Sequence, residues 1–326
     1  MSQKEFAARM DMSEKHISKL INGKVRLTVD TAGRLELVLG VPAQFWNNLE
    51  SRYREMEAKA NEENKMDADA EIAERFPYSE MSKYNWVEKT NDINEKVTNL
   101  RKYFEVVTLQ LLENKLITKL TCRRLAITEK SDLALMALAQ KAKLESRSVE
   151  TAPISIDGLI KLIPEIRNLT MRRPEEFSPQ LKEDLRKCGI AFILLPHLKG
   201  SFLQGMTFQD GNKLILGLTP SSKDADGFWF GLFHELAHII LGHYSNINGI
   251  TQDDENEAAV TANNIIFKPD EFEIFKNNNN FSEQSVMEFA KEQGVSPGIV
   301  VGRLQFDGLV KYDKLNHLKD KFDIIL

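Results

Sequence analysis

Three of the six histidines in this 326-residue chain fall within ten residues, in the stretch WFGLFHELAHIILGH from Trp229 to His243. His234 and His238 are four residues apart, and Glu235 follows the first of them directly. On a helix, side chains four residues apart lie on one face, so the two imidazoles would meet at one point. This H-E-x-x-H spacing is typical of zinc sites in which the two His bind the metal, the metal lowers the pKa of a water molecule to about 7, and the Glu acts as general base.

A buried helix with incidental histidines is the alternative interpretation of this stretch. Apolar residues recur at helical spacing through it, no Pro interrupts it, and Gly242 marks its end. Two His and a Glu among so many apolar neighbours need partners, because an unpaired polar group in a core costs a few kcal/mol, roughly. The composition of the stretch therefore favours a metal site.

A catalytic zinc usually takes three protein ligands and a water molecule. His243 does not match the longer pattern H-E-x-x-H-x-x-G-x-x-H, because Leu241 stands in place of the Gly and Tyr244 in place of the last His, so we interpret it as a helix-end residue. A second helix is predicted in TQDDENEAAVTANNIIF, and it offers Glu255 and Glu257. Glu255 is the preferred third ligand, and spacing alone leaves Glu257 as its rival.

From about Ile163 to its end, the chain resembles the ImmA/IrrE metallopeptidases. These zincin-like enzymes carry H-E-x-x-H on one helix and E-x-x-A-[ND]-x-F-A on the next, and the first Glu of the second pattern is a zinc ligand. The resemblance implies that zinc is held by His234, His238 and Glu255, with Glu235 as the catalytic base. Ala259 and Thr261 depart from the pattern, since the family prefers Asn or Asp at the first position and Phe at the second.

Three short strands are predicted before the motif, in GIAFILLPHL, SFLQGMTFQ and NKLILGLT. Asp210-Gly211 is the expected hairpin turn between the last two. The fold class predicted for the chain is mostly α with a small antiparallel sheet. It would combine an N-terminal helix-turn-helix bundle with a C-terminal zincin-like α+β peptidase domain.

The first 24 residues contain two short helical segments joined by a tight turn. The first is predicted over Gln3 to Met10, and the second runs from the N-cap Ser13 to Asn22, before Gly23. The apolar residues expected between them are Phe6, Ala7, Met10, Met12, Ile17, Leu20 and Ile21. The spacing predicts a helix-turn-helix with residues 14–19 as recognition helix. A plain helical hairpin is the alternative, but residues 1–34 hold seven Lys or Arg and four Asp or Glu, a net +3 in a chain of net −5, which favours phosphate contact.

The segments SQKEFAARM, SEKHISKLINGK and LVLGVPAQFWNNLESRYRE resemble Xre-type repressors and, more narrowly, the HigA-like antitoxins. The resemblance implies one contact to a backbone phosphate and four to bases, in that order through Gln3, Glu14, Lys15, Ser18 and Lys19. Asp11 occupies a turn position usually held by Gly, so we expect a positive φ there. Compared with that group the chain begins at the second helix of the bundle, which predicts a DNA-binding domain without its first helix.

Length and composition predict two or three globular domains in a cytoplasmic protein. The domains expected are a helix-turn-helix domain at 1–56, a charged linker and helical region at 57–150, and the peptidase-like domain with C-terminal helices at 151–326. Cys122 and Cys188 are far apart, which indicates a reducing compartment without a disulfide framework. The N-terminus is polar and no apolar run approaches 18 residues, so we expect neither export nor membrane association.

Together these features predict a DNA-binding regulator that carries a zinc-dependent metalloendopeptidase. Its expected partners are a double-stranded DNA operator bound as a homodimer, a toxin, and a protein substrate that is a repressor, an antitoxin or the chain itself. Residues 58–77 are charged and helix-prone, which predicts a linker helix or lever. The expected cleavage targets are the helix-turn-helix domain or the charged stretch from Asn61 to Ala70, which we expect to be exposed and extended enough to enter a peptidase cleft. The alternative hypothesis is a non-enzymatic, antitoxin-type repressor whose zinc domain senses a signal or binds a toxin.

Overall fold

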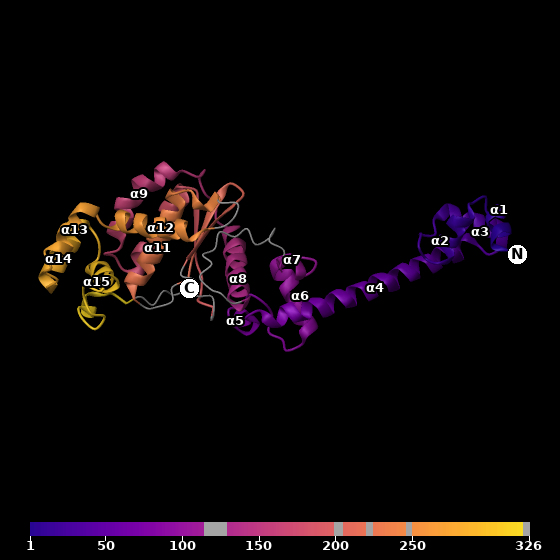
Figure 1. Cartoon of the computed structure of the whole chain (residues 1–326), viewed down its shortest axis with the longest axis horizontal. Coiled ribbons are helices and arrows are strands. Elements are labelled where there is room, and N and C mark those ends of the chain that lie inside the picture. Colours follow the sequence, from indigo (N-terminus) through magenta and orange to yellow (C-terminus); the bar gives the residue numbers. More distant parts are fainter. Residues whose placement is uncertain (114–128, 199–204, 220–223, 246–249, 322–326) are drawn as a thin grey trace. The chain divides into compact units, whose positions relative to one another are not determined.

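The structure is a computed structural model that describes residues 1–113, 129–198, 205–219, 224–245 and 250–321 (Figure 1). Most of these residues lie in helices, and a small three-stranded sheet accompanies them. The contacts divide the chain into two compact units, Met1–Asp69 and Ala70–Leu326. Each unit has a hydrophobic core of its own.

The first unit is a small helical bundle. Its helices are α1 (Gln3–Arg9), α2 (Glu14–Ile21), α3 (Val29–Leu39) and the first part of α4 (Ala43–Arg75). Both predicted N-terminal helices are confirmed, and the Ser13 hydroxyl accepts a hydrogen bond from the His16 backbone N–H at the start of α2. Asp11 has φ +54°, as expected for the turn between them.

The core of the first unit differs from the expected one at two positions. Ala7, Met10 and Ile17 are buried as predicted, but Ile21 is 67% exposed, so its assignment to the core is wrong. Leu35 of α3 completes the core instead, with Val38 and Trp46 packed against it. The prediction considered only the first two helices. With Leu35 of α3 in the core, the end of α2 lies outside it.

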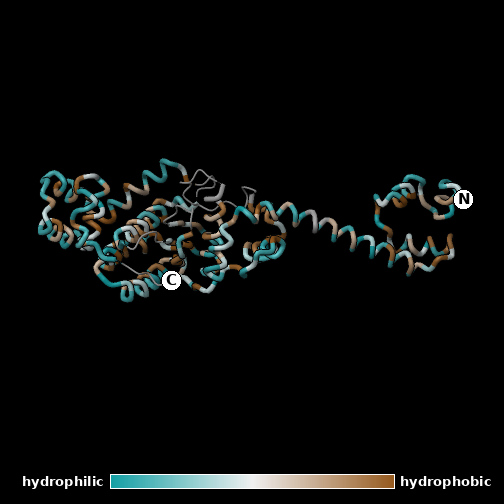
Figure 2. The backbone as a smooth tube through the Cα atoms, turned by 90° about the horizontal axis from the view of Figure 1, so that it is seen from below, coloured by the Kyte–Doolittle hydropathy of each residue, from teal (hydrophilic) through white to brown (hydrophobic). Residues whose placement is uncertain are grey.

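Helix α4 runs without interruption through the predicted domain boundary at residue 56 and through the stretch from Asn61 to Ala70. The predicted linker helix is therefore present, whereas the expectation that the stretch is extended enough to enter a peptidase cleft is wrong. Arg54 forms ion pairs with Glu50 and Glu57 at helical spacing, which stabilises the helical conformation by a few tenths of a kcal/mol per pair, roughly. The trace of α4 is largely hydrophilic beyond its first turns (Figure 2).

The second unit surrounds a sheet with helices. The elements before the sheet are α5 (Tyr78–Lys83), α6 (Ile93–Phe104), α7 (Gln110–Glu113), α8 (Glu129–Ser146), α9 (Ile156–Leu169) and α10 (Pro174–Lys187). The strands are β1 (Ile190–Leu194), β2 (Gly205–Asp210) and β3 (Lys213–Leu218). The elements after the sheet are α11 (Ala225–Ile240), η1 (His243–Ser245), α12 (Gln252–Ile266), α13 (Pro269–Asn277), α14 (Glu283–Gln293), α15 (Pro297–Phe306) and η2 (Asn316–Leu318).

The three predicted strands are present, but the sheet is mixed and not antiparallel. The strand order is β1-β3-β2, with β2 antiparallel and β1 parallel to β3. A tight turn with Gly211 at φ +62° joins β2 and β3, so this pair is antiparallel as predicted. β1 lies beside β3, the central strand, and runs parallel to it. Residues 201–204, the start of the predicted middle strand, lie outside the described residues.

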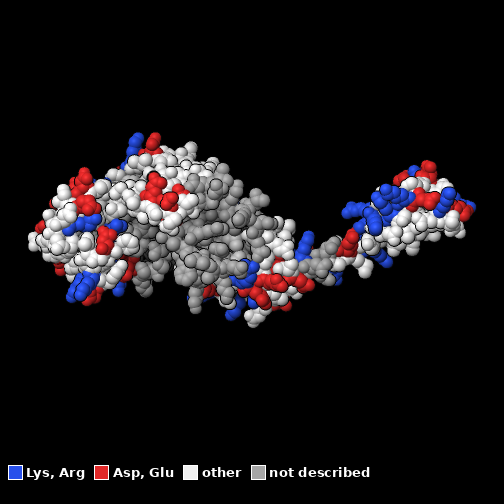
Figure 3. Space-filling view, in the orientation of Figure 1, with Lys and Arg blue, Asp and Glu red and all other residues white. Residues whose placement is uncertain are grey.

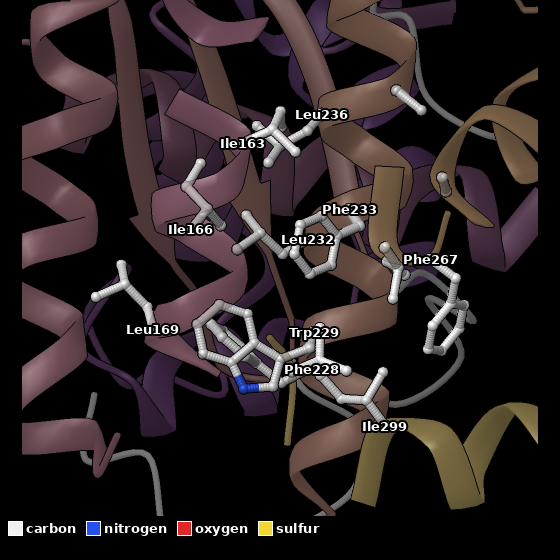
Figure 4. Packing of buried hydrophobic residues seen from close by; sticks show 14 of the residues in the cluster. Ile163, Ile166, Leu169, Phe228, Trp229, Leu232, Phe233, Leu236, Phe267 and Ile299 are labelled. Atoms are coloured by element: carbon white, nitrogen blue, oxygen red, sulfur yellow. The ribbon is translucent and has the colours of Figure 1, made fainter. Parts of the chain in front are cut away.

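Helix α11 is the centre of the core of the second unit. Trp229, Leu232, Phe233 and Leu236 repeat at helical spacing and are fully buried. Figure 4 shows this face of α11 against α9, which contributes Ile166 to the same cluster, with Phe267 and Ile299 close by. The opposite face of α11 carries the histidines, so the packing of its apolar face determines where the imidazoles point.

The remaining composition-based expectations concern cysteines and membranes. Cys188 is buried without a disulfide, and burial raises the pKa of its thiol, while Cys122 lies outside the described residues. None of the described helices combines the length and the apolar character that crossing a membrane requires.

Candidate metal centre

The two motif histidines lie one turn apart on α11, as the i, i+4 spacing predicts. The helix continues to Ile240, and Gly242 follows it at φ +77°. His238 is buried and His234 is about 16% exposed at its side chain. The distance between their Nε2 atoms is 3.0 Å. The helix therefore directs both ring nitrogens toward one point.

Glu255 reaches the same point from α12. Its Oε2 lies 3.2 Å from Nε2 of His234, and its Oε1 lies 3.7 Å from Nε2 of His238. Four ligand atoms arranged as a tetrahedron around zinc at 2.0–2.1 Å are about 3.3 Å apart. The 3.0 Å between the two Nε2 atoms and the 3.2 Å from Nε2 of His234 to Oε2 of Glu255 are close to that value, and the other carboxylate oxygen, Oε1, lies 3.7 Å from Nε2 of His238. Two imidazoles and one carboxylate are also a ligand set that catalytic zinc uses, so these residues fit the metal.

The start of α12 determines which of its carboxylates meets the histidines. Thr251 and Asp254 form a reciprocal capping box, in which the Thr251 hydroxyl accepts from the Asp254 backbone N–H and Asp254 Oδ2 accepts from the Thr251 backbone N–H. This places Glu255 in the first turn, where it is buried. Glu257 is two residues further on, about 200° around the helix, and its side chain is 61% exposed. The structure thus brings Glu255, and not Glu257, to the two motif histidines.

Glu235 is held beside this cluster by β2. The Thr207 hydroxyl donates a hydrogen bond of 2.7 Å to Oε2 of Glu235, and the Glu235 side chain is buried. A Cβ atom on Gly205 would lie 2.5 Å from Cγ and 2.7 Å from Oε1 of Glu235. The absence of a side chain at Gly205 therefore creates the space that Glu235 occupies. Sequence reasoning identified Glu235 but missed Thr207 and Gly205, because neither carries a motif signal and the contact crosses from strand to helix.

His243 also lies at this centre, although it is not grouped with the three candidate ligands. Its Nδ1 is 2.9 Å from Nδ1 of His238, and it is buried. Its Nε2 is 3.6 Å from Oδ1 of Asp254 and 3.6 Å from Oε2 of Glu257. The interpretation of His243 as a simple helix-end residue is therefore incomplete, since it contacts one of the motif histidines.

A cavity of about 460 Å³ opens beside the cluster, between α11, α12 and α15. Its lining includes His234, Glu235 and Glu255. Asp226 and Asn263 line it too, and each has a buried side-chain oxygen, Oδ1, with no hydrogen-bond partner among the described residues. The cavity thus lies against the cluster, and these two acceptors are covered by protein atoms.

The predicted DNA-contacting residues lie in the first unit. Gln3, Glu14, Lys15 and Lys19 are exposed, and Ser18 is half-buried. The Gln3 amide donates to the Glu14 carbonyl over 3.4 Å, which joins the starts of α1 and α2. Figure 3 shows Lys and Arg side chains gathered on part of the visible face of this unit.

Comparisons with known proteins identify the N-terminal domain. Residues 1–46 match the model of a helix-turn-helix family. The chain is 36% identical over 59 residues to an Escherichia coli (strain K12) protein described as the uncharacterised HTH-type transcriptional regulator YddM. That match covers 18% of this chain and 63% of the relative. No solved structure matches the chain. The N-terminal domain is thus a helix-turn-helix domain, and the residues of the metal centre lie outside the family match.

Proposed function

We propose that this protein is a DNA-binding transcription regulator that carries a zinc-dependent metallopeptidase domain. The single observation behind the peptidase is the convergence of two imidazole nitrogens and one carboxylate within 3.7 Å of one another, next to Glu235 and at the wall of a cavity. The substrate would be a regulatory protein, namely a repressor, an antitoxin or the chain itself.

The chain's own residues divide the proposed chemistry between binding and proton transfer. His234, His238 and Glu255 would hold the metal. Bound zinc would supply a Lewis acid that polarises a peptide carbonyl and lowers the pKa of a water molecule to about 7. Glu235 would accept the proton of that water as general base, a role that contributes about 10²–10⁴-fold to a rate. The Thr207 hydroxyl would position the Glu235 carboxylate by donating a hydrogen bond to its Oε2.

The cavity supports a peptide as the substrate class. Its lining combines apolar side chains, among them Phe230 and Phe306, with polar ones such as Asn256. A peptide presents both apolar side chains and backbone hydrogen-bonding groups, and a pocket of mixed lining suits such a ligand.

The N-terminal domain supports the regulatory half of the proposal. A helix-turn-helix places its second helix in the major groove, and dimers read palindromic sites. The similarity to a relative described as a transcriptional regulator favours the same role here. We propose that the chain binds a double-stranded operator as a homodimer, and that cleavage of a regulatory protein changes repression.

One observation favours a second candidate function. Ala259 lines the cavity at the position where peptidases of the ImmA/IrrE type prefer Asn or Asp, and its methyl group makes no hydrogen bond. Loss of a polar group that supports a metal-ligating His lowers metal affinity or activity by about 10–100-fold. The alternative is therefore a non-enzymatic, antitoxin-type repressor whose zinc domain senses a signal or binds a toxin.

Incubation of the zinc-loaded protein with itself and with the products of neighbouring genes, read by intact mass, tests the proposal. The expected result is a cleaved species that is absent with Glu235→Gln and with metal-free protein. Gln has nearly the shape of Glu but cannot accept the proton, so this variant is the matched control. If both forms retain zinc and neither cleaves any candidate, the sensing or toxin-binding function is the better one.

A further inference from the structure

The chain turns at Gly242, directly after α11, and this turn places His243 against the candidate metal centre. Gly242 has φ +77°, in the left-handed region that favours glycine, and η1 begins at the next residue. Nδ1 of His243 thereby lies 2.9 Å from Nδ1 of His238. His243 is buried, so this contact is shielded from solvent.

The direction of the hydrogen bond between His238 and His243 follows from the proposed role of His238 as a metal ligand. A metal ligand needs the lone pair of its ring nitrogen, so His238 must leave Nε2 unprotonated and carry its proton on Nδ1. The His238 Nδ1–H then donates to the lone pair on Nδ1 of His243. A neutral His243 with an unprotonated Nδ1 carries its proton on Nε2.

The carboxylates of α12 favour that same tautomer of His243. Its Nε2 lies 3.6 Å from Oδ1 of Asp254 and 3.6 Å from Oε2 of Glu257. A protonated Nε2 directed toward two negative charges is electrostatically favoured over a lone pair there. The first turns of α12 thus supply Glu255 to the ligand cluster and two further carboxylates to His243.

We propose that His243 is a positioning residue that orients His238 and selects its metal-binding tautomer. This inference rests on the proposed zinc site, and it assigns a role to a residue outside the predicted ligand set. Peptidases of the ImmA/IrrE type prefer Asn or Asp where this chain has Ala259, whose methyl group cannot be a polar partner for a ligating His. His243, on η1, supplies such a partner instead. Partners of this kind are worth about 10–100-fold in metal affinity.

Two variants separate the hydrogen bond from the packing of a buried ring. His243→Leu keeps an apolar side chain of moderate size but has no acceptor for the His238 Nδ1–H. His243→Asn places Oδ1 on the Cγ atom, where the ring has Nδ1, and so keeps an acceptor in the same place. His317→Leu is the control for loss of a histidine, because His317 is exposed and lies on η2.

Zinc dissociation constants, measured by chelator competition at fixed pH, give the main result. We expect His243→Leu to bind zinc about 10–100-fold more weakly than wild type, and His243→Asn to stay within about threefold. The ligand-field bands of the cobalt-loaded protein should change in His243→Leu and be recovered in His243→Asn. The metal-free forms should unfold at similar temperatures, and His317→Leu should match wild type throughout.

The contrary outcomes distinguish a failure of the positioning role from a failure of the zinc site. Equal zinc affinity in wild type and His243→Leu, with unchanged cobalt bands, refutes the positioning role while leaving the zinc site intact. Equal weakening in the Leu and Asn variants shows that packing, and not the hydrogen-bond acceptor, is responsible, and refutes it too. If the wild-type protein binds no zinc at this cluster, the proposed function fails first and this inference with it.

Discussion

A methyl group at Gly205 tests whether the space beside Glu235 matters for catalysis. Gly205 begins β2 and is not among the residues with positive φ, so alanine is compatible with its backbone. The new Cβ would lie 2.5 Å from Cγ of Glu235. The substitution therefore perturbs the proposed base while leaving its chemical identity unchanged.

The size of the effect follows from that distance. Ordinary van der Waals contacts of a Cβ begin at 3.4 Å, so Glu235 must retreat by about 1 Å, the difference between 3.4 and 2.5 Å. A displacement of this size at a reacting group can cost about 10²-fold in rate. The upper limit is complete loss of the base, about 10²–10⁴-fold. Because the nearest atom is Cγ of a buried, hydrogen-bonded side chain, the displacement should also cost about 1–3 kcal/mol in folding stability.

Cleavage rates and zinc content of four proteins provide the assay: wild type, Gly205→Ala, Glu235→Gln and the double variant. We expect Gly205→Ala to retain zinc and to cleave about 10²-fold more slowly. In the Glu235→Gln background the same alanine should have little further effect, because the group it displaces is already inactive. Gly33→Ala is the control, since a Cβ at Gly33 meets nothing within 4 Å.

Three results would refute this reasoning. The first is a Gly205→Ala protein that cleaves at the wild-type rate, which would show that the position of Glu235 is unimportant. The second is an equal rate loss from the alanine in both backgrounds, which would show that it acts independently of Glu235. Loss of zinc from Gly205→Ala would also contradict the separation of the base from the ligands.

Three further predictions follow from the metal centre and the N-terminal domain. Glu235→Gln should hold zinc as wild type does, by elemental analysis, and lose cleavage by about 10²–10⁴-fold, so an unchanged rate would end the peptidase interpretation. Glu255→Ala should lose zinc whereas Glu257→Ala should retain it, because only Glu255 lies against both ligand histidines, and the reverse result would reassign the third ligand. Lys15→Ala or Lys19→Ala should weaken binding to DNA upstream of the chain's own operon in a titration, by about 1–3 kcal/mol for a lost base contact. Binding of the wild type should itself fall steeply as salt rises, and wild type that binds nothing at low salt would contradict a DNA-binding function.

Sequence patterns predicted the elements whose ends depend on nearby residues. Ser13 caps α2, and the helix begins where this capping residue indicates. Gly211 turns the chain between β2 and β3, and Gly242 follows the last turn of α11. Caps and turns involve hydrogen bonds over two to four residues, so their signals are present in short stretches of sequence.

The same patterns were wrong where the answer depended on a distant element. Ile21 has the helical spacing of a core residue, yet it is exposed, because the core that includes Leu35 of α3 does not extend to the end of α2. The stretch from Asn61 to Ala70 was expected to be extended enough to enter a peptidase cleft, yet it continues α4. β1 was expected to join an antiparallel sheet, yet its partner is β3 and the pair is parallel.

The candidate metal centre shows where local and tertiary information divide. The sequence by itself determined that His234 and His238 share a helix face, since a spacing of four residues on α11 requires it. Spacing alone left Glu257 as a rival to the preferred Glu255, because the choice between them depends on how α12 packs against α11. The sequence gave no sign of Thr207, Gly205 or the contact between His238 and His243. Thr207 and Gly205 belong to β2, and His243 belongs to η1. Both elements contact α11 only in the folded chain, where the apolar face of α11 is buried, so short stretches of sequence carry no signal for these contacts.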